Sequence, residues 1–340
     1  MLTVRSLLAL GLLAAAEALP GPQLNPRAKA KATGGGRQKA QTAFQQAQQI
    51  PQGVSTATDG STILDMTAQV NGLPLRFKIS GPADQFTTDS GVTGGTQAAN
   101  ATGTLGLNVL LHGDGGQSFF DFPNQAVQKN LAGVAVLAPD PNLFWGGGSG
   151  LDRTDGVAHA QAVNDLVQTV LPQVMAFNAS QVSFTGVSGG SLMLSGFFVP
   201  AHMTNFAGAG NGVLLNCGGL APQVDFVDAA GVAAATRIHF QSTQQELALL
   251  QGSIPDSVAA YEQVAADAGL SADQIGALQT VDNSPDGGHC EFDGKDFVSG
   301  VQLMADSFSD VMQGGTGQVN GVNVLNTVVG NENLQFSGAT

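Results

Sequence analysis

Short apolar runs, separated by glycine, proline and small polar residues, divide the chain into predicted strands and helices. The runs at residues 64–69 and 75–79 flank an Asn-Gly pair, which is typical of the tight turn of a β-hairpin. Residues 107–111 and 133–138 are apolar at nearly every position, which favours strands buried on both faces of a parallel sheet. The pattern therefore predicts a hairpin followed by parallel strands.

Segments with helical spacing alternate with these strands. Residues 158–170 predict a helix that ends at Pro172, and residues 190–199 predict a second one that ends at Pro200. Further strands and a last helix are expected at residues 182–185, 213–215, 237–240 and 296–312. Alternation of this kind over about 250 residues predicts an α/β fold, with a mostly parallel sheet and helices on both faces.

The first fifty residues differ in composition from the rest. An apolar run behind a basic residue, followed by a small-x-small triplet at residues 16–18, indicates a secretory signal peptide over residues 1–18. Residues 19–50 carry five basic residues and no acidic one and are rich in Gln and Ala, which indicates a linker or a removable pro-segment. We expect residues 51–330 to form a single domain and residues 331–340 a polar tail.

Export sets the chemistry expected of the two cysteines. In an oxidising compartment, Cys217 and Cys290 are expected to form one disulfide bond. The triplets that begin at Asn100 and Asn178 match the N-glycosylation sequon, which a eukaryotic secretory route would use. No apolar run beyond the signal reaches the length of a membrane helix. We therefore expect a secreted, extracellular glycoprotein with no membrane partner.

The charge balance argues against one class of partner. The 340 residues include 26 Asp or Glu and only 12 Lys or Arg, a formal net charge of -14 at pH 7. Nucleic acid needs clustered positive charge to neutralise its phosphates, so we expect no nucleic-acid partner. The oligomeric state is left open. With 43% hydrophobic residues, the chain is able to bury a large core.

A Gly-x-Ser-x-Gly motif occupies residues 186–190. In a chain with 46 glycines such a match arises easily by chance, but this one lies between a predicted strand and a predicted helix. A serine nucleophile on a strand-turn-helix elbow requires that context. Glycines at both ends of the motif let the turn close while Ser188 points outward. Ser188 is therefore the candidate nucleophile.

A glycine-rich loop, residues 112–116, follows the strand predicted at 107–111. Backbone N–H groups in such a loop are free to hold the negative oxygen that develops during acyl transfer. We expect the oxyanion hole to consist of the N–H of Gly189 and that of either Asp114 or Gly115.

Three aromatic residues are candidates for the substrate pocket. Phe119, Phe144 and Trp145 follow the two buried strands, and ligands bind at the carboxyl edge of such sheets. A place in the hydrophobic core is the equal alternative. The chain has one Trp and one Tyr, which are too few to favour a platform of stacked aromatic rings for binding a polysaccharide.

Serine needs a general base, and His289 is the best candidate among the five histidines. It follows a turn-rich loop and precedes the last predicted helix. A competing signal overlaps it, because Asp282, Ser284, Asp286 and Asp293 mimic the ligand spacing of a calcium loop. A proline interrupts that loop and no flanking helices are evident. We therefore expect neither a metal ion nor a cofactor, and calcium remains the open alternative.

These features together resemble the α/β-hydrolase fold over about residues 60–315. Within that fold, the chain is most similar to secreted fungal esterases of the feruloyl esterase, acetylxylan esterase and polyhydroxybutyrate depolymerase type. Their early loop begins Leu-His-Gly, as residues 111–113 do here. His289-Cys290 also resembles the His-Cys pair of tannase-like esterases, in which a disulfide braces the catalytic histidine. Here Val187 rather than a cysteine precedes the serine, so Cys217 is the expected partner.

The resemblance implies a catalytic acid after the strand predicted at 237–240. Glu246 lies there and is the first candidate for holding the imidazole in the required tautomer. Asp256 is the rival, and Asp225 or Asp228 would serve if the acid followed the preceding strand.

The resemblance also implies a function. A serine esterase would hydrolyse a carboxylic ester, small or polymer-linked, through an acyl-enzyme. An ester of the plant cell wall or a polyester would be such a substrate. A non-catalytic secreted binding protein of the same fold is the alternative, and a peptidase is a third option.

Overall fold

The structure is a computed structural model that describes residues 51–57, 59–119, 127–128, 130–206, 208, 211–319 and 334–338. The predicted signal peptide and linker, and half of the predicted tail, lie outside these residues. Among the helices of the described part, none is long and apolar enough to cross a membrane.

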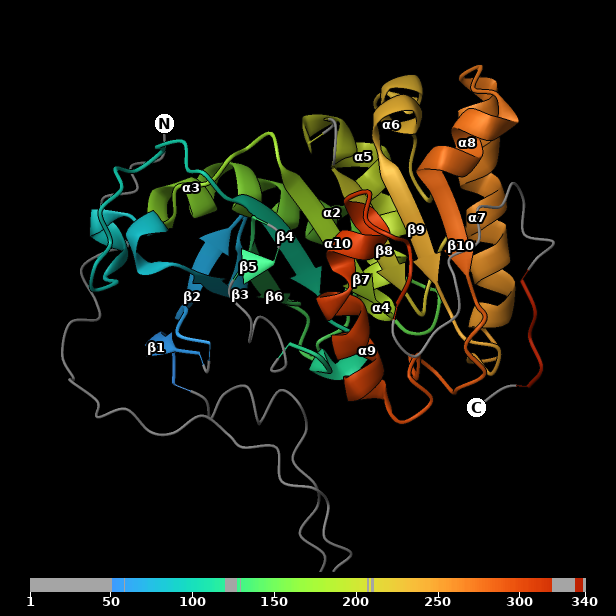
Figure 1. The fold of residues 1–340 in the computed structure, drawn as a ribbon, viewed down its shortest axis with the longest axis horizontal. Helices are drawn as coiled ribbons and strands as arrows, with labels where there is room; N and C mark the ends of the chain where they lie inside the picture. The colour runs from blue at the N-terminus through green and yellow to red at the C-terminus, as the bar shows by residue number, and fades with distance from the viewer. Residues whose placement is uncertain are drawn as a thin grey trace, which may run out of the picture. The chain divides into compact units, whose positions relative to one another are not determined.

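A mostly parallel sheet forms the centre of the fold (Figure 1). Its strands are β1 (Gly53–Thr56), β2 (Thr62–Val70), β3 (Leu73–Gly81), β4 (Gly106–Leu111), β5 (Val127–Gln128), β6 (Leu131–Leu137), β7 (Val182–Val187), β8 (Gly212–Asn216), β9 (Arg237–Gln241) and β10 (Gln279–Asp282). They follow the order β1-β2-β3-β6-β4-β7-β8-β9-β10, with β5 paired to β6. Pairing is antiparallel from β1 to β6 and parallel from β6 to β10, which confirms the predicted mostly parallel sheet.

The predicted hairpin is β2 and β3. Their register pairs Val70 with Leu73, which leaves Asn71 and Gly72 as a two-residue loop with φ values of 52° and 81°. Two consecutive positive φ angles match the right-handed twist of the flanking strands, and Asn-Gly reaches them at low cost.

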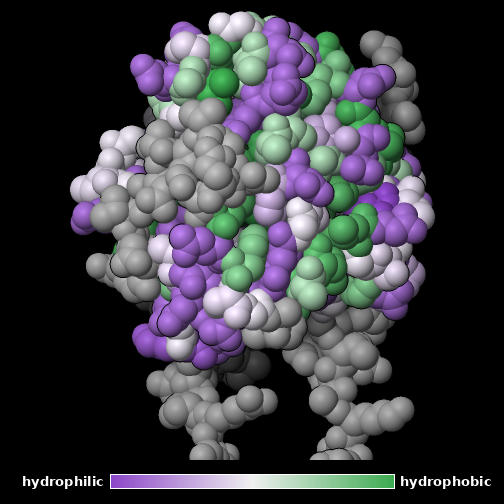
Figure 2. Space-filling view, turned by 90° about the vertical axis from the view of Figure 1, so that its right-hand side faces the viewer, coloured by the Kyte–Doolittle hydropathy of each residue, from purple (hydrophilic) through white to green (hydrophobic). Residues whose placement is uncertain are grey.

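Helices cover both faces of the sheet. They are α2 (Gly156–Asp165), α3 (Leu171–Val174), α4 (Gly189–Met193), α5 (Val199–His202), α6 (Ala229–Ala235), α7 (Leu250–Asp267), α8 (Ala272–Leu278), α9 (Phe297–Asp306) and α10 (Phe308–Met312). In Figure 1, α9 and α10 lie in front of the sheet and α2 lies behind it. On the side that carries the β10 edge, hydrophobic residues occur in small groups between hydrophilic ones (Figure 2).

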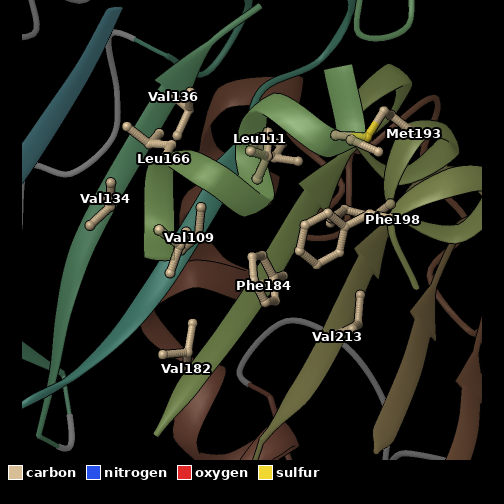
Figure 3. Packing of buried hydrophobic residues seen from close by; sticks show 14 of the residues in the cluster. Val109, Leu111, Val134, Val136, Leu166, Val182, Phe184, Met193, Phe198 and Val213 are labelled. Atoms are coloured by element: carbon tan, nitrogen blue, oxygen red, sulfur yellow. The ribbon is translucent and has the colours of Figure 1, made fainter. Parts of the chain in front are cut away.

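Side-chain alternation along the central strands explains the two layers. Val109 of β4 and Val134 of β6 belong to the larger hydrophobic cluster, which includes residues of α2, α4 and α7. The next residues, Leu110 and Ala135, belong to the second cluster, with residues of α9 and α10. Successive side chains of a strand point to opposite faces of the sheet. Strands that are apolar at every position therefore need helices packed on both faces. Figure 3 shows the larger cluster where the ring of Phe184 in β7 faces that of Phe198.

The helix ends predicted at Pro172 and Pro200 are wrong. Both helices continue through a π-helical turn, Leu166–Val170 or Leu194–Phe198, and the proline falls in the first turn of the next helical segment. A π turn is wider than an α turn, so it accommodates a proline, which has no N–H and whose ring crowds the preceding turn. Pro200 has no N–H to donate to the Gly196 carbonyl. That carbonyl accepts a hydrogen bond from the Gln223 N–H instead, at 2.8 Å.

Candidate active site

Ser188 occupies a sharp turn between β7 and α4. Its φ of 50° and ψ of −113° are rare for a residue with a side chain and mark local strain. The flanking glycines are required sterically, because a Cβ at Gly186 would lie 2.6 Å from the Ser191 nitrogen and one at Gly190 would overlap the Leu111 carbonyl. Gly186 and Gly190 thus make the turn possible, as the motif predicts, and the turn places Ser188 at the carboxyl edge of the sheet.

The structure brings Ser188, His289 and Glu246 into one hydrogen-bonded chain. Ser188 Oγ lies 3.0 Å from His289 Nε2, and His289 Nδ1 hydrogen-bonds to Glu246 Oε1. Glu246 is fully buried, and the same oxygen accepts a hydrogen bond from the Leu247 N–H at 2.8 Å. A carboxylate there fixes the Nδ1–H tautomer, which leaves Nε2 free to accept the serine proton, and it stabilises the imidazolium that results.

Two adjacent loops carry the acid and the base. The acid loop (residues 242–246) follows β9, and the histidine loop (residues 283–290) follows β10. Hydrogen bonds join the two loops from Thr243 Oγ1 to the Gly288 carbonyl at 3.0 Å and from the Gln244 N–H to the Pro285 carbonyl at 2.8 Å. Because β9 and β10 are parallel neighbours, their carboxyl ends place both loops at the same edge.

The disulfide bond predicted between Cys217 and Cys290 is present. Cys217 follows β8, and Cys290 is the neighbour of the catalytic candidate His289, so the bond ties the histidine loop to the sheet beside the Ser188 turn. On its other side the loop packs against α9, where a Cβ at Gly300 would overlap the Cys290 carbonyl.

The other candidate acids lie elsewhere. Asp256 is exposed in α7, a helix that the sequence pattern did not predict. Asp225 is exposed as well. Asp228 caps α6, where its carboxylate accepts a hydrogen bond from the Gly231 N–H at 2.9 Å.

The carboxylates of the calcium-like spacing do not converge. Asp282 is buried and accepts a hydrogen bond from the Ser284 N–H, whereas Asp286 is exposed. Within the described residues, Cys217, His289 and Cys290 form the one group of His, Cys, Asp or Glu close enough to share an ion. The two sulfurs of that group are bonded to each other, so it offers no set of metal ligands.

Of the two alternatives for the second oxyanion donor, the structure favours Asp114. The Gly115 N–H donates to the Leu143 carbonyl at 3.1 Å, so the expectation for Gly115 is wrong. The N–H groups of Asp114 and Gly189 have no acceptor among the described residues. The loop also lies against Ser188, because a Cβ at Gly113 would be 3.5 Å from the Ser188 Cβ.

His112 anchors this loop to the sheet. Burial lowers the pKa of His112 to about 4, so the ring is neutral at pH 7. Nδ1 donates to the Gly113 carbonyl at 2.6 Å, and Nε2 accepts from the Ala138 N–H at 2.9 Å. His112 therefore joins residues 112–116 to the segment after β6.

An ion pair on the same loop was not predicted from the sequence. Both oxygens of Asp114 accept hydrogen bonds from Arg153, at 2.8 and 2.7 Å. Arg153 also donates to the carbonyls of Trp145 and Gly150, at 3.1 and 2.7 Å. A lone arginine in a polar loop carries no motif, so only the folded chain shows this contact.

Two of the three aromatic candidates are core residues. Trp145 is fully buried, with ring centroids 5.6 Å from His112 and 6.0 Å from His159. Phe119 is also buried, and the Lys78 Nζ lies over its ring, 4.6 Å from the ring centroid. Phe144 is half-buried.

Phe297, which no sequence motif singled out, borders the catalytic candidates. This half-buried residue begins α9, and its ring centroid lies 5.9 Å from that of His289. Its Cζ would lie 3.4 Å from a Cβ at Gly113. Phe297 therefore presents an apolar surface between the glycine-rich loop of residues 112–116 and the histidine loop.

The order of the strands, the elbow after β7 and the order Ser188, Glu246, His289 along the chain define an α/β-hydrolase fold. No protein-family model and no curated protein matches the chain. Similar solved structures include a thermostable esterase with a TM-score of 0.47 and 15% identity, which covers 76% of this chain. The chain spans 63% of that esterase's length.

Two other similar structures come from named bacteria. The Bacillus cereus carboxylesterase has a TM-score of 0.41 and 15% identity, covering 57% of this chain and 84% of its own. LpqC, the poly(3-hydroxybutyrate) depolymerase of Bordetella parapertussis, has a TM-score of 0.40 and 15% identity, covering 79% of this chain and 92% of its own.

Proposed function

We propose that this protein is a serine hydrolase that cleaves a carboxylic ester through an acyl-enzyme. The observation that carries the proposal is the chain of hydrogen bonds from Ser188 through His289 to the buried carboxylate of Glu246. A hydroxyl, an imidazole and a carboxylate in this sequence of contacts make serine nucleophilic at neutral pH.

The proposed reaction has two halves. In the first, Ser188 Oγ bonds to the ester carbonyl carbon while its proton passes to His289 Nε2. The carbonyl oxygen becomes negative and is held by the N–H groups of Gly189 and Asp114. His289 then gives the proton to the departing alcohol. In the second half, water takes the place of the alcohol, and its attack releases the carboxylic acid and restores Ser188.

The surroundings of Ser188 favour an ester with an apolar part. Phe297 supplies an aromatic surface beside His289, and such surfaces bind acyl or aryl groups by burial of apolar area. From the resemblance of residues 111–113 to the secreted fungal esterases, we propose a plant cell-wall ester or a polyester as the natural substrate class.

We further propose that the protein is exported and glycosylated. The disulfide supports export, because such bonds persist in oxidising compartments. Asn100, in one of the two sequons, is exposed.

A turnover panel of acetyl, butyryl and feruloyl esters tests the function. Wild-type protein is expected to hydrolyse at least one of them, and Ser188→Ala to lose at least about 10⁴-fold in kcat. Ser55→Ala, at an exposed position in β1, is the matched control and should retain full turnover.

The same panel separates the alternatives. Folded wild-type protein that turns over no ester would refute the proposal and favour a binding protein. Casein degradation without ester turnover would point instead to a peptidase.

A further inference from the structure

The second oxyanion donor, Asp114, carries a charge of its own beside the site where a negative oxygen would develop. Its backbone N–H is open among the described residues, while its carboxylate lies against Gly189, the residue of the first donor. A Cβ at Gly189 would overlap Asp114 Oδ1. The two donor residues are therefore in contact through this carboxylate.

Arg153 holds the Asp114 carboxylate from the protein side. The Arg153 side chain is 1% exposed and that of Asp114 is 25% exposed, so the guanidinium sits beneath a carboxylate that still reaches solvent. The two parallel hydrogen bonds fix the carboxylate in a plane, which a single contact would not do. The Trp145 and Gly150 carbonyls fix the guanidinium in turn.

We infer that Arg153 is a positioning residue for the oxyanion hole and acts through Asp114, an inference that rests on the function proposed above. It orients the loop that carries the Asp114 N–H, and its positive charge offsets the carboxylate. Without the guanidinium, the uncompensated charge of Asp114 would oppose the negative charge that forms on the substrate oxygen. The effect falls on the transition state, because the neutral ester in the ground state carries no such charge.

Four proteins test the inference: the wild type, Arg153→Met, the double variant Asp114→Asn/Arg153→Met, and Arg76→Met. The last is the matched control, because Arg76 forms a similarly buried bidentate pair with Asp65, between β2 and β3. For each protein, kcat and KM are measured with the best ester of the panel. The rate of inactivation by an organophosphonate is measured as well, since its phosphoryl oxygen takes the place of the oxyanion.

Arg153→Met is expected to lower kcat by about 10- to 100-fold, with KM within about threefold of the wild type. Phosphonate inactivation should slow in parallel. The double variant, which lacks the uncompensated carboxylate, should regain part of the loss. Arg76→Met should unfold at a lower temperature but keep kcat per folded molecule within about twofold.

Three results with a folded Arg153→Met variant would overturn the inference. They are wild-type kcat, a rise in KM in place of the fall in kcat, and a double variant that regains none of the lost kcat. If the single variant does not fold, the double variant decides. A roughly tenfold lower kcat at constant KM supports the inference, and wild-type kcat refutes it. A wild type that neither turns over esters nor reacts with the phosphonate would refute the proposed function. A reactive wild type whose kcat is indifferent to Arg153 would refute only the positioning role.

Discussion

The two sides of Ser188 are held in place by different physical means. On the acid-histidine side, hydrogen bonds join the acid loop to the histidine loop, and the Cys217–Cys290 disulfide ties the latter to the end of β8. On the oxyanion side, residues 112–116 are held by the ion pair of Asp114 with Arg153 and by the neutral ring of His112. The first side depends mainly on a covalent bond and on hydrogen bonds between two loops, and the second on an ion pair and on the hydrogen bonds of a buried imidazole.

This difference implies that the two sides should fail under different perturbations. Reduction of the disulfide should disturb the histidine and leave the oxyanion donors in place. Loss of the positive charge of Arg153 should instead act on the oxyanion side, because it leaves the Asp114 carboxylate uncompensated. Variants that affect one side alone can therefore separate proton transfer from oxyanion binding.

The largest effect short of removing the nucleophile is expected from Glu246→Gln on the acid-histidine side. An amide stabilises the imidazolium poorly and no longer fixes the tautomer, so kcat should fall by about 10³- to 10⁴-fold. Steady-state turnover of the best ester measures the loss. Asp256→Asn, at the exposed rival acid in α7, is the control and should keep wild-type kcat. Equal losses in both variants would contradict the assignment.

On the oxyanion side, Gly189→Ala should lower kcat by about 100-fold. The added methyl group would overlap Asp114 Oδ1 and push the two donor residues apart. Gly252→Ala in α7 is the matched control, because a Cβ there meets no atom within 4 Å. That variant should keep kcat and gain about 0.5–1 kcal/mol of stability. Wild-type turnover by Gly189→Ala would show that the contact is unimportant.

Removal of the disulfide should affect stability more than chemistry. Cys217→Ser/Cys290→Ser is expected to lose up to about 4 kcal/mol in free energy of unfolding, because the bond closes a loop between residues 73 apart. We expect kcat of the folded variant to fall about tenfold, since the histidine loop is less constrained. Urea unfolding and turnover below the unfolding temperature measure the two effects. Wild-type kcat in the folded variant would show that the disulfide does not hold the histidine loop in its active position.

Acid should destabilise the fold through two buried histidines. Burial lowers the pKa of His112 and of His239 from 6.5 to about 4. Between these pH values the unfolded chain binds protons that the folded chain does not. The free energy of unfolding should therefore decrease as pH falls from about 6.5 to about 4, and the decrease should be large enough to measure.

Urea unfolding at pH 7 and at pH 5 measures this slope. His239→Gln, which removes one of the two groups, should make the slope shallower. A free energy of unfolding that stays constant or rises toward pH 5 in the wild type would contradict the burial argument.

The smallest effect is expected at Phe297, which borders both sides. Phe297→Ala should raise KM several-fold for feruloyl and butyryl esters and change it little for acetyl esters, because only larger groups reach the lost apolar surface. Val298→Ala, at the exposed neighbouring position, is the control. An equal change for all three esters would argue against a role in substrate selection.

The parts of the fold that the sequence predicts well are those with a strong local signal. The hairpin carries an Asn-Gly turn, and the buried strands are apolar at nearly every position, so both could be identified without tertiary contacts. The ends of the helices around Pro172 and Pro200 could not, because the π turns that accommodate the prolines have no sequence signature. Helix α7 was not predicted from the sequence; it contains Pro255, a residue that usually ends or kinks a helix.

Within the site, residues with a motif or a place implied by the family resemblance could be proposed from the sequence, and residues defined by tertiary contact could not. Ser188 lies in its elbow motif, His289 follows a turn-rich loop before the last predicted helix, and Glu246 is implied by the family resemblance. Arg153, which binds Asp114, lies just after a turn in which Gly146, Gly147 and Gly148 have positive φ angles. The sequence shows these glycines, but it does not show which carboxylate the turn brings to the arginine.

Reaction with an organophosphonate, followed by intact mass and peptide mapping, shows directly which side chain of the folded protein is the nucleophile. One adduct per folded chain, on the peptide that carries Ser188, is the predicted result, with no adduct in Ser188→Ala. A folded wild-type chain that stays unmodified, or that is modified at another serine, would contradict the claim that Ser188, His289 and Glu246 act together.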